Sequence, residues 1–288
     1  MFSYICFMNN LTDLLDQLKA LENDRQSGSS EILRQVVDLV KQGLSNNLFN
    51  SNRDLLELIA ALSALEHNFP CFAAVGHFAR TLRQATDAAS FGALVMAYKQ
   101  NWKNAAERAA RLFMSNVELE GKTILLNSQS GSVVELFRQF AKKNGNCRII
   151  QMESRPEYEG IKQAERLAGL GFDATLVADA AFTRYIDSID MAILGADAIC
   201  RNAFINKTGS HSVALAANAY GFPLYLLADS RKFIDRDCFQ TGEHMKPSPA
   251  FGDYKLASPR VRFENFYFEI VPLKYVAGVC VESEFRRI

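Results

Sequence analysis

Short apolar runs alternate with helix-length segments between residues 120 and 230, and this alternation limits the possible folds more than any other feature of the sequence. Helical patterns at 133–143, 160–170 and 210–220 separate the runs. Because strand–helix–strand repeats place their strands in parallel through right-handed crossovers, we predict an α/β fold with a mostly parallel sheet and helices on both of its faces. The predicted strands are Thr123–Leu126, Arg148–Met152, Ala174–Val177, Asp190–Leu194 and Pro223–Leu227.

The chain before residue 119 has a different, helical pattern. Leucines at 11, 14, 15, 18 and 21 recur every three or four residues, which gives one apolar helix face. Further helical patterns cover 55–65 and 85–114, and the breaks fall at 24–31 and 67–70. We therefore predict a helical N-terminal domain over residues 1–118 and a sheet-containing domain over residues 119–288.

The last part of the chain is less periodic. Residues 235–260 are rich in glycine, proline, serine and charge, which is typical of a long functional or mobile loop. Residues 263–271 and 275–281 have the composition of strands that close the sheet.

Polar residues follow four of the predicted strands: Ser128, the segment Glu153-Ser154-Arg155, Asp197 and the pair Asp229-Ser230. The carboxyl ends of parallel strands meet at one edge of the sheet, where open α/β folds bind their ligands. Serine, arginine and aspartate together favour a phosphorylated ligand that is rich in hydroxyl groups. This edge is our candidate site.

Individual residues suggest roles at that edge. The loop containing Ser130 and Gly131 opens a helix, whose free N–H groups would favour an anion, although helix capping alone explains such a loop equally well. Arg155 and Lys207 could add charge-assisted contacts. Asp197 could exchange protons with a sugar hydroxyl if it is partly desolvated.

Several nearby residues have simpler explanations. Asp179 is expected to cap a helix rather than to act in catalysis. His211 lies early in a helix, where a structural role is favoured over a contact with ligand. Cys200 is expected to be a small core residue rather than a reactive thiol. No histidine or cysteine spacing indicates a metal site, and we expect no cofactor.

Composition excludes several function classes. The chain has 32 basic and 32 acidic residues, which argues against a surface that coats nucleic acid or an anionic membrane. The six cysteines are scattered, a pattern that favours reduced cytoplasmic thiols over a disulfide framework. No apolar run approaches the ~18–20 residues of a membrane span. The apolar start MFSYICF lacks the basic flank of a signal peptide, and its position before Met8 suggests the hypothesis that residues 1–7 precede the native start.

Longer motifs carry a family resemblance. GADAI, followed by INKTGSHSVALAANAYGFPLYLLADSRKF, resembles the translation initiation factor 2B alpha/beta/delta family, which includes methylthioribose-1-phosphate isomerase and ribose-1,5-bisphosphate isomerase. MESRPEYEG at 152–160 and NDRQSGSSE at 23–31 are similar to further motifs of that family. ENFYFEIVPLKYVAGVCVE is similar to its closing segment, with Glu269 and Val271 as substitutions.

The resemblance implies a Rossmann-like C-terminal domain, a homodimer or higher homo-oligomer, and a sugar-phosphate or nucleotide pocket between the domains. It places the isomerases' proton shuttle on Asp197 and their substrate contacts on Asn206 and Lys207, and it matches Arg155 to the family's Arg-Pro position. Ser128 stands where the isomerases have a catalytic cysteine, and a serine hydroxyl is far less acidic than a thiol of pKa ~8.5. Their N-terminal Arg-Gly-Ala phosphate motif has no clear counterpart.

Three hypotheses follow. The first is a cytoplasmic protein that binds a phosphorylated sugar, such as a ribose phosphate, or a nucleotide between its domains. It could act as an atypical aldose–ketose isomerase, with Asp197 as proton shuttle and Ser128 as a hydrogen-bonding partner. The second is a non-catalytic regulatory or scaffold subunit that only senses the ligand. The third is a translation factor with a protein partner. Retained Asp197 favours the first hypothesis, whereas Ser128 favours the second.

Overall fold

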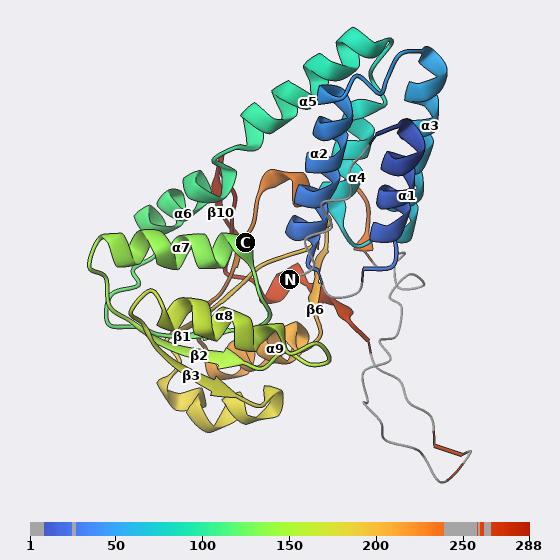
Figure 1. The fold of residues 1–288 in the computed structure, drawn as a ribbon. Helices are drawn as coiled ribbons and strands as arrows, with labels where there is room; N and C mark the ends of the chain where they lie inside the picture. The colour runs from blue at the N-terminus through green and yellow to red at the C-terminus, as the bar shows by residue number, and fades with distance from the viewer. Residues whose placement is uncertain (1–8, 25–26, 239–257, 259, 262–265) are drawn as a thin grey trace. The chain divides into compact units, whose positions relative to one another are not determined.

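The computed structural model describes residues 9–24, 27–238, 258, 260–261 and 266–288 (Figure 1). The chain divides into two compact units, Met1–Lys103 and Asn104–Ile288. The hypothesis about residues 1–7 and most of the predicted 235–260 loop lie outside the described residues.

Unit 1 is helical, as its leucine spacing predicts. Its helices are α1 (Leu11–Leu21), α2 (Ser29–Ser45), α3 (Asn52–Asn68), α4 (Ala73–Leu82) and α5 (Ala88–Trp102). Local capping fixes several helix starts: the Ser51 side chain accepts from the backbone N–H of Asp54 at the start of α3, and Asp87 and Ser90 form a similar box at α5. Leu14 and Leu18, on the predicted apolar face of α1, are fully buried.

The predicted helical pattern over 85–114 is two helices, α5 and α6 (Ala105–Asn116), with Lys103 and Asn104 between them. The division into units falls at this break, so α6 belongs to unit 2, whereas the sequence assigns it to the N-terminal domain. Ala109, Ala110 and Phe113 of α6 are buried in a core cluster formed with residues of the sheet.

Unit 2 contains a seven-stranded sheet in the order β10-β9-β7-β4-β1-β2-β3. All adjacent pairs are parallel except β9 and β10. The predicted strands are confirmed, and the order of the parallel strands is that of a Rossmann-like fold. Their bounds are β1 (Thr123–Leu126), β2 (Arg148–Met152), β3 (Asp173–Val177), β4 (Met191–Leu194), β7 (Leu224–Leu227), β9 (Gly278–Cys280) and β10 (Phe285–Arg287).

Helices cover both faces of this sheet. Along β1, Ile124 and Leu126 pack into one core cluster and Leu125 into another, because successive strand side chains point to opposite faces. The first cluster includes residues of α6, α7 (Gly131–Lys142) and α8 (Glu159–Ala168). Figure 1 shows α7 and α8 over the labelled strands β1, β2 and β3, and α6 beside β10. The second includes residues of α9 (Ser210–Tyr220) and the 3-10 helix η1 (Asp179–Ser188).

A separate three-stranded sheet was missed in the sequence. It consists of β5 (Ala198–Ile199), β6 (Ala203–Lys207) and β8 (Phe268–Pro272), with β6 antiparallel to both neighbours. β6 is buried along its whole length and contains both apolar and polar residues, so it lacks the alternation that reveals a half-buried strand. This sheet carries Asn206 and Lys207.

Of the two predicted closing strands, only the second closes the main sheet: β9 falls within 275–281. β8 overlaps the predicted 263–271 but pairs in the second sheet, and residues 262–265 lie outside the described part of the chain. Ser230–Lys232 forms a short 3-10 helix, η2, after β7. Residues 233 and 234 then run beside β5, where Phe233 forms a bridge with Ile199.

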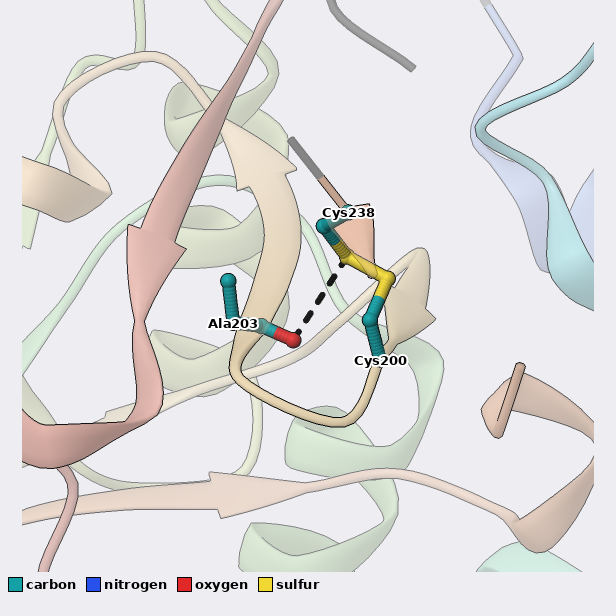
Figure 2. Close-up of a disulfide and its surroundings, with 3 residues drawn as sticks. All are labelled: Cys200, Ala203 and Cys238. Atoms are coloured by element: carbon teal, nitrogen blue, oxygen red, sulfur yellow. Dashed lines mark hydrogen bonds between the residues drawn. A yellow bond between two sulfur atoms is a disulfide. The ribbon is translucent and has the colours of Figure 1, made fainter. Parts of the chain in front are cut away.

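The expectation of reduced thiols is wrong for two cysteines. Cys200 and Cys238 form a disulfide, with their Cα atoms 5.5 Å apart (Figure 2). Cys238 Sγ also lies 3.6 Å from the Ala203 carbonyl oxygen. The two cysteines are 38 residues apart in sequence, and tertiary contacts such as the bridge between Ile199 and Phe233 bring their segments together. Sequence spacing could not show that proximity.

Candidate functional site

The sheet changes its winding direction between β1 and β4. From β1 the chain crosses to β2 and β3 on one side, and from β4 it crosses to β7 and β9 on the other. Ligands of open α/β folds bind beyond the strand ends at such a switch point. Asn127 and Ser128 follow β1 there, and Gly195-Ala196-Asp197 follows β4. A Cβ atom at Gly195 would lie 2.7 Å from Ser130 Oγ, so the absence of a side chain lets the two strand ends approach closely.

Two serines hold the loops after β1 and β2 together. Ser128 and Ser154 both have left-handed backbone conformations, with φ of 67° and 66°. The Ser128 N–H donates to Ser154 Oγ at 2.7 Å, and Ser154 Oγ lies 3.0 Å from Asn127 Oδ1. Asp179 accepts from the N–H groups of Ser154 and Arg155, both at 2.7 Å. Asp179 is thus structural. The prediction that it caps a helix is wrong, because it is the first residue of η1 and its carboxylate fixes the β2 loop.

The Ser128 side chain points to a buried ion pair. Its hydroxyl donates to Glu159 Oε1 at 2.8 Å, and the same oxygen lies 2.7 Å from Lys207 Nζ. Glu159 is 9% exposed and Lys207 is 1% exposed. Ser128, from the end of β1, and Lys207, from β6, therefore meet at one carboxylate.

The second sheet holds Asn206 and Lys207 in place. Asn206 donates through Nδ2 to Ser210 Oγ at 2.8 Å, and Ser210 Oγ donates to the Lys207 carbonyl at 2.7 Å. The Lys207 ammonium lies 3.0 Å from the centre of the Tyr267 ring, a cation–π contact. Burial lowers the pKa of Lys207, while Glu159 and Asp197 act in the opposite direction. The ammonium is therefore influenced by both carboxylates.

Asp197 belongs to a second charged group. Its Oδ1 lies 3.8 Å from Lys232 Nζ, and its side chain is 16% exposed. Burial lowers the pKa of the Lys232 ammonium, against the effect of Asp197 and Asp229. Asp229 makes a bidentate contact with Arg231, at 2.8 and 3.0 Å. Burial raises the pKa of Asp229, but the Arg231 contacts outweigh it and hold that pKa below the usual range.

The helix start at Ser130 and Gly131 is a conventional cap. Ser130 is the N-cap of α7, and its Oγ accepts from the Val133 N–H at 3.4 Å. The Ser130 N–H itself donates to Gln163 Oε1 at 2.8 Å. Capping therefore explains the serine, while a Cβ atom at Gly131 would meet nothing within 4 Å, so there is open space beside the helix start.

Arg155 is placed apart from these charged groups. Its side chain is exposed, donates to the Tyr158 hydroxyl and lies over the Tyr158 ring, 4.7 Å from the ring centre. Within the described part of the chain, the structure does not bring Arg155 to the Ser128–Glu159–Lys207 group. Its proposed role as a ligand contact stays a prediction.

A buried carboxylate organises the start of α9. Glu269, opposite Asn206 in the β6–β8 ladder, accepts from the His211 N–H at 2.6 Å. Burial raises the pKa of Glu269, partly offset by the N–H groups at 209–211 and by His211. The His211 ring packs against Tyr275, with ring centres 6.1 Å apart. The structural role predicted for His211 agrees with these contacts.

Neither a metal-binding cluster nor a membrane-spanning helix is found in the described residues. Over residues 9–24, 27–238 and the described positions beyond, no three His, Cys, Asp or Glu side chains are grouped so as to hold a metal ion. In the same residues, no helix combines the length and the apolar character that crossing a membrane requires.

A model of the Initiation factor 2 subunit family matches residues 25–283, almost the whole length of the chain. The chain belongs to the Initiation factor 2 subunit family. The resemblance predicted from its motifs is thereby confirmed.

The curated proteins similar to this chain include translation initiation factor-like proteins and sugar-phosphate isomerases. A putative translation initiation factor eIF-2B subunit 2-like protein of Pyrococcus horikoshii is 30% identical over 164 residues, 57% of each chain. A ribose 1,5-bisphosphate isomerase of Methanocaldococcus jannaschii is 29% identical over 175 residues, 59% of this chain and 56% of that protein. The match thus spans little more than half the length of either relative.

The fold comparison covers more of the chain. The crystal structure of the Pyrococcus horikoshii OT3 translation initiation factor eIF-2B superposes with a TM-score of 0.81 at 23% identity, covering 94% of this chain and 96% of that one. This similarity confirms the fold of the Initiation factor 2 subunit family.

Two site residues were missed in the sequence of this family member. Glu159 lies in the MESRPEYEG motif, but only its neighbours were assigned a role, although a carboxylate at the first position of a helix after a strand is a recognisable signal. Lys232 follows Asp229-Ser230 by two residues and lies beside Asp197 only because its segment runs along β5. That proximity leaves no signal in the sequence.

Proposed function

We propose that unit 2 binds a phosphorylated sugar at the β1–β4 switch point and interconverts its aldose and ketose forms, with Asp197 moving the proton. The observation that carries the proposal is the presence of two buried lysines paired with carboxylates, Lys207 with Glu159 and Lys232 with Asp197, among residues at and around the strand ends where ligands bind in this class of fold. Carboxylates beside buried lysines provide groups that can accept and return protons.

The anionic part of the ligand would meet positive potential at the same place. Lys207 and Lys232 are the buried ammonium groups of the site, and the open start of α7 at Gly131 supplies N–H groups and the positive end of a helix dipole. The name of the Methanocaldococcus relative supports a ribose phosphate as the ligand. Asn206 and Arg155 remain proposed substrate contacts.

The first test is turnover by the full chain. Ribose 1,5-bisphosphate and methylthioribose 1-phosphate are incubated with the protein, and the ketose product is followed by NMR. Asp197→Asn keeps the shape of the side chain but removes its capacity to carry a proton, so we expect turnover to fall by about 10²–10⁴-fold. Asp187→Asn, an exposed aspartate of η1, is the matched control and should behave as wild type. Equal turnover by Asp197→Asn would contradict the role of Asp197.

One observation favours a second candidate, a non-catalytic regulatory or scaffold subunit. Ser128 replaces the thiol of the isomerases, and its hydroxyl is already used as a donor to Glu159. In that case the same sugar phosphates would raise the melting temperature of the protein, since a ligand that binds only the folded state stabilises it by about 2.7 kcal/mol at a hundred times its Kd. Stabilisation by either compound without product would support this candidate, whereas product formation would exclude it.

The assembly state and partner are also proposals. We expect a homodimer or higher homo-oligomer, because the family resemblance implies one, and a cytoplasmic protein that can meet a translation-factor partner. Sedimentation of the full chain as a monomer at micromolar concentration would contradict the first expectation.

A further inference from the structure

The two carboxylate oxygens of Glu159 differ in their contacts. Oε1 faces the Ser128 hydroxyl and the Lys207 ammonium. Oε2 is buried, and within the described residues no donor hydrogen-bonds to it. A buried acceptor without a partner is destabilising because it has lost its hydrogen bonds to water, so such atoms normally have one. The hydroxyl of a ligand would supply it.

The backbone around Glu159 is tightly fixed. Tyr158, which precedes it, is in the left-handed conformation with φ of 56°, and α8 begins at Glu159 itself. The next residue, Gly160, packs so closely on the end of β2 that a Cβ atom would lie 1.9 Å from the Met152 carbonyl oxygen. The first turn of α8 is therefore pressed against the sheet, which holds the Glu159 carboxylate at the switch point.

The ammonium group paired with Glu159 also has unused donor capacity. Lys207 Nζ forms the ion pair with Glu159 and the contact with the Tyr267 ring, but makes no hydrogen bond within the described part of the chain. The pair suits a ligand in which a hydroxyl group lies next to an acceptor oxygen. Sugar phosphates have this arrangement.

We propose that Glu159 is a second catalytic residue of this site, with Oε2 accepting a proton from carbon while Ser128 and Lys207 hold Oε1. The inference rests on the proposed isomerase function. It assigns to a carboxylate the carbon-acid chemistry for which the Ser128 hydroxyl is too weak an acid, and leaves Ser128 as a positioning residue.

The proton transfers balance for ribose 1,5-bisphosphate. The ring bond between C1 and O4 breaks, and O4 takes a proton from Asp197. Glu159 removes the proton from C2 and returns it to C1, while O2 becomes the ketone oxygen and gives its proton to Asp197. Both carboxyl groups end as they began, and no oxidant or reductant is consumed.

The test compares Glu159→Gln with wild type in the full chain, using ribose 1,5-bisphosphate. Glutamine keeps the size of the side chain but cannot accept the proton, so we expect kcat to fall by about 10²–10⁴-fold while Kd from calorimetry changes by less than about tenfold. Glu165→Gln removes an exposed carboxylate from the same helix and should leave both values unchanged. Wild-type kcat in Glu159→Gln overturns the inference and leaves the proposed function standing, whereas an inactive wild-type protein overturns both.

A second variant covers the case in which glutamine beside Lys207 prevents folding. Glu159→Asp keeps the negative charge but withdraws the carboxylate by one methylene group, and a displacement of about 1 Å can cost on the order of 10²-fold in rate. We expect a folded protein with that loss. Ser128→Ala should lower kcat on the order of tenfold, because Oε1 loses one of its two contacts. Full activity of Glu159→Asp would also overturn the inference.

Discussion

The Lys207 side chain, with its ammonium group, is almost completely shielded from solvent. Removing only one partner of a buried ion pair leaves the other charge uncompensated, which costs about 3–5 kcal/mol. We therefore expect Lys207→Met to lower the free energy of unfolding by that amount, and Lys207→Met combined with Glu159→Gln to recover much of it. Urea denaturation measures both. Lys162→Met, on the exposed side of α8, is the control, and a Lys207→Met protein as stable as this control would contradict the prediction.

Part of the site could be predicted from single residues. Asp197 and Ser128 are predicted at strand ends because polar residues after parallel strands share one edge, and Lys207 is predicted as a charged contact nearby. The structure brings Ser128 and Lys207 to the same carboxylate. Glu159 was not predicted, because a glutamate at a helix start has a simpler explanation in the helix dipole. Lys232 could not be predicted, since its approach to Asp197 depends on a contact between distant segments.

At the scale of elements, the junction of β8 with α9 should respond to pH. Because burial raises the pKa of Glu269 in the folded protein above its usual value of 4.5, its protonated form contributes stability below pH 4.5, and this contribution is lost as the pH rises through the raised folded value. Glu269→Gln is neutral throughout. We expect the stability of wild type relative to Glu269→Gln to decrease from about pH 4 to pH 7.

Denaturation curves across this pH range provide the measurement. Glu165→Gln, with an exposed carboxyl group, should show no such trend. If the free energy of unfolding of wild type relative to Glu269→Gln instead increased with pH, the backbone donors at the start of α9 would dominate over burial.

The same elements show what periodicity can reveal. The β1–β4 and β7 strands and helices α7–α9 were predicted within a few residues, because each has one clear period and a glycine or polar residue at its end. β5 and β6 were missed because β5 has only two residues and β6 is buried on both faces. The second sheet is thus a product of tertiary pairing with β8, which lies more than sixty residues beyond β6.

At the scale of the whole molecule, the sequence predicts a helical part followed by an α/β part, and the structure has both. The position of α6 was not predicted, because its alanine-rich face fits a helical domain and a sheet surface equally well. The disulfide was not predicted either. Closing a loop of 38 residues stabilises a protein by about 4 kcal/mol in the chain-entropy model.

The Cys200–Cys238 bond also makes the chain between these residues a covalent ring that contains β6, α9 and β7. A protease recognition sequence inserted in the exposed turn after Tyr220 tests this arrangement. After cleavage we expect one band on a denaturing gel without reductant and two bands with it, whereas Cys238→Ser should give two bands in both lanes. Two bands from the unreduced parent would contradict the bond. A cut after Tyr220 interrupts the backbone between Lys232 and its neighbour Asp197, but the Cys200–Cys238 bond would still keep both residues on one molecule.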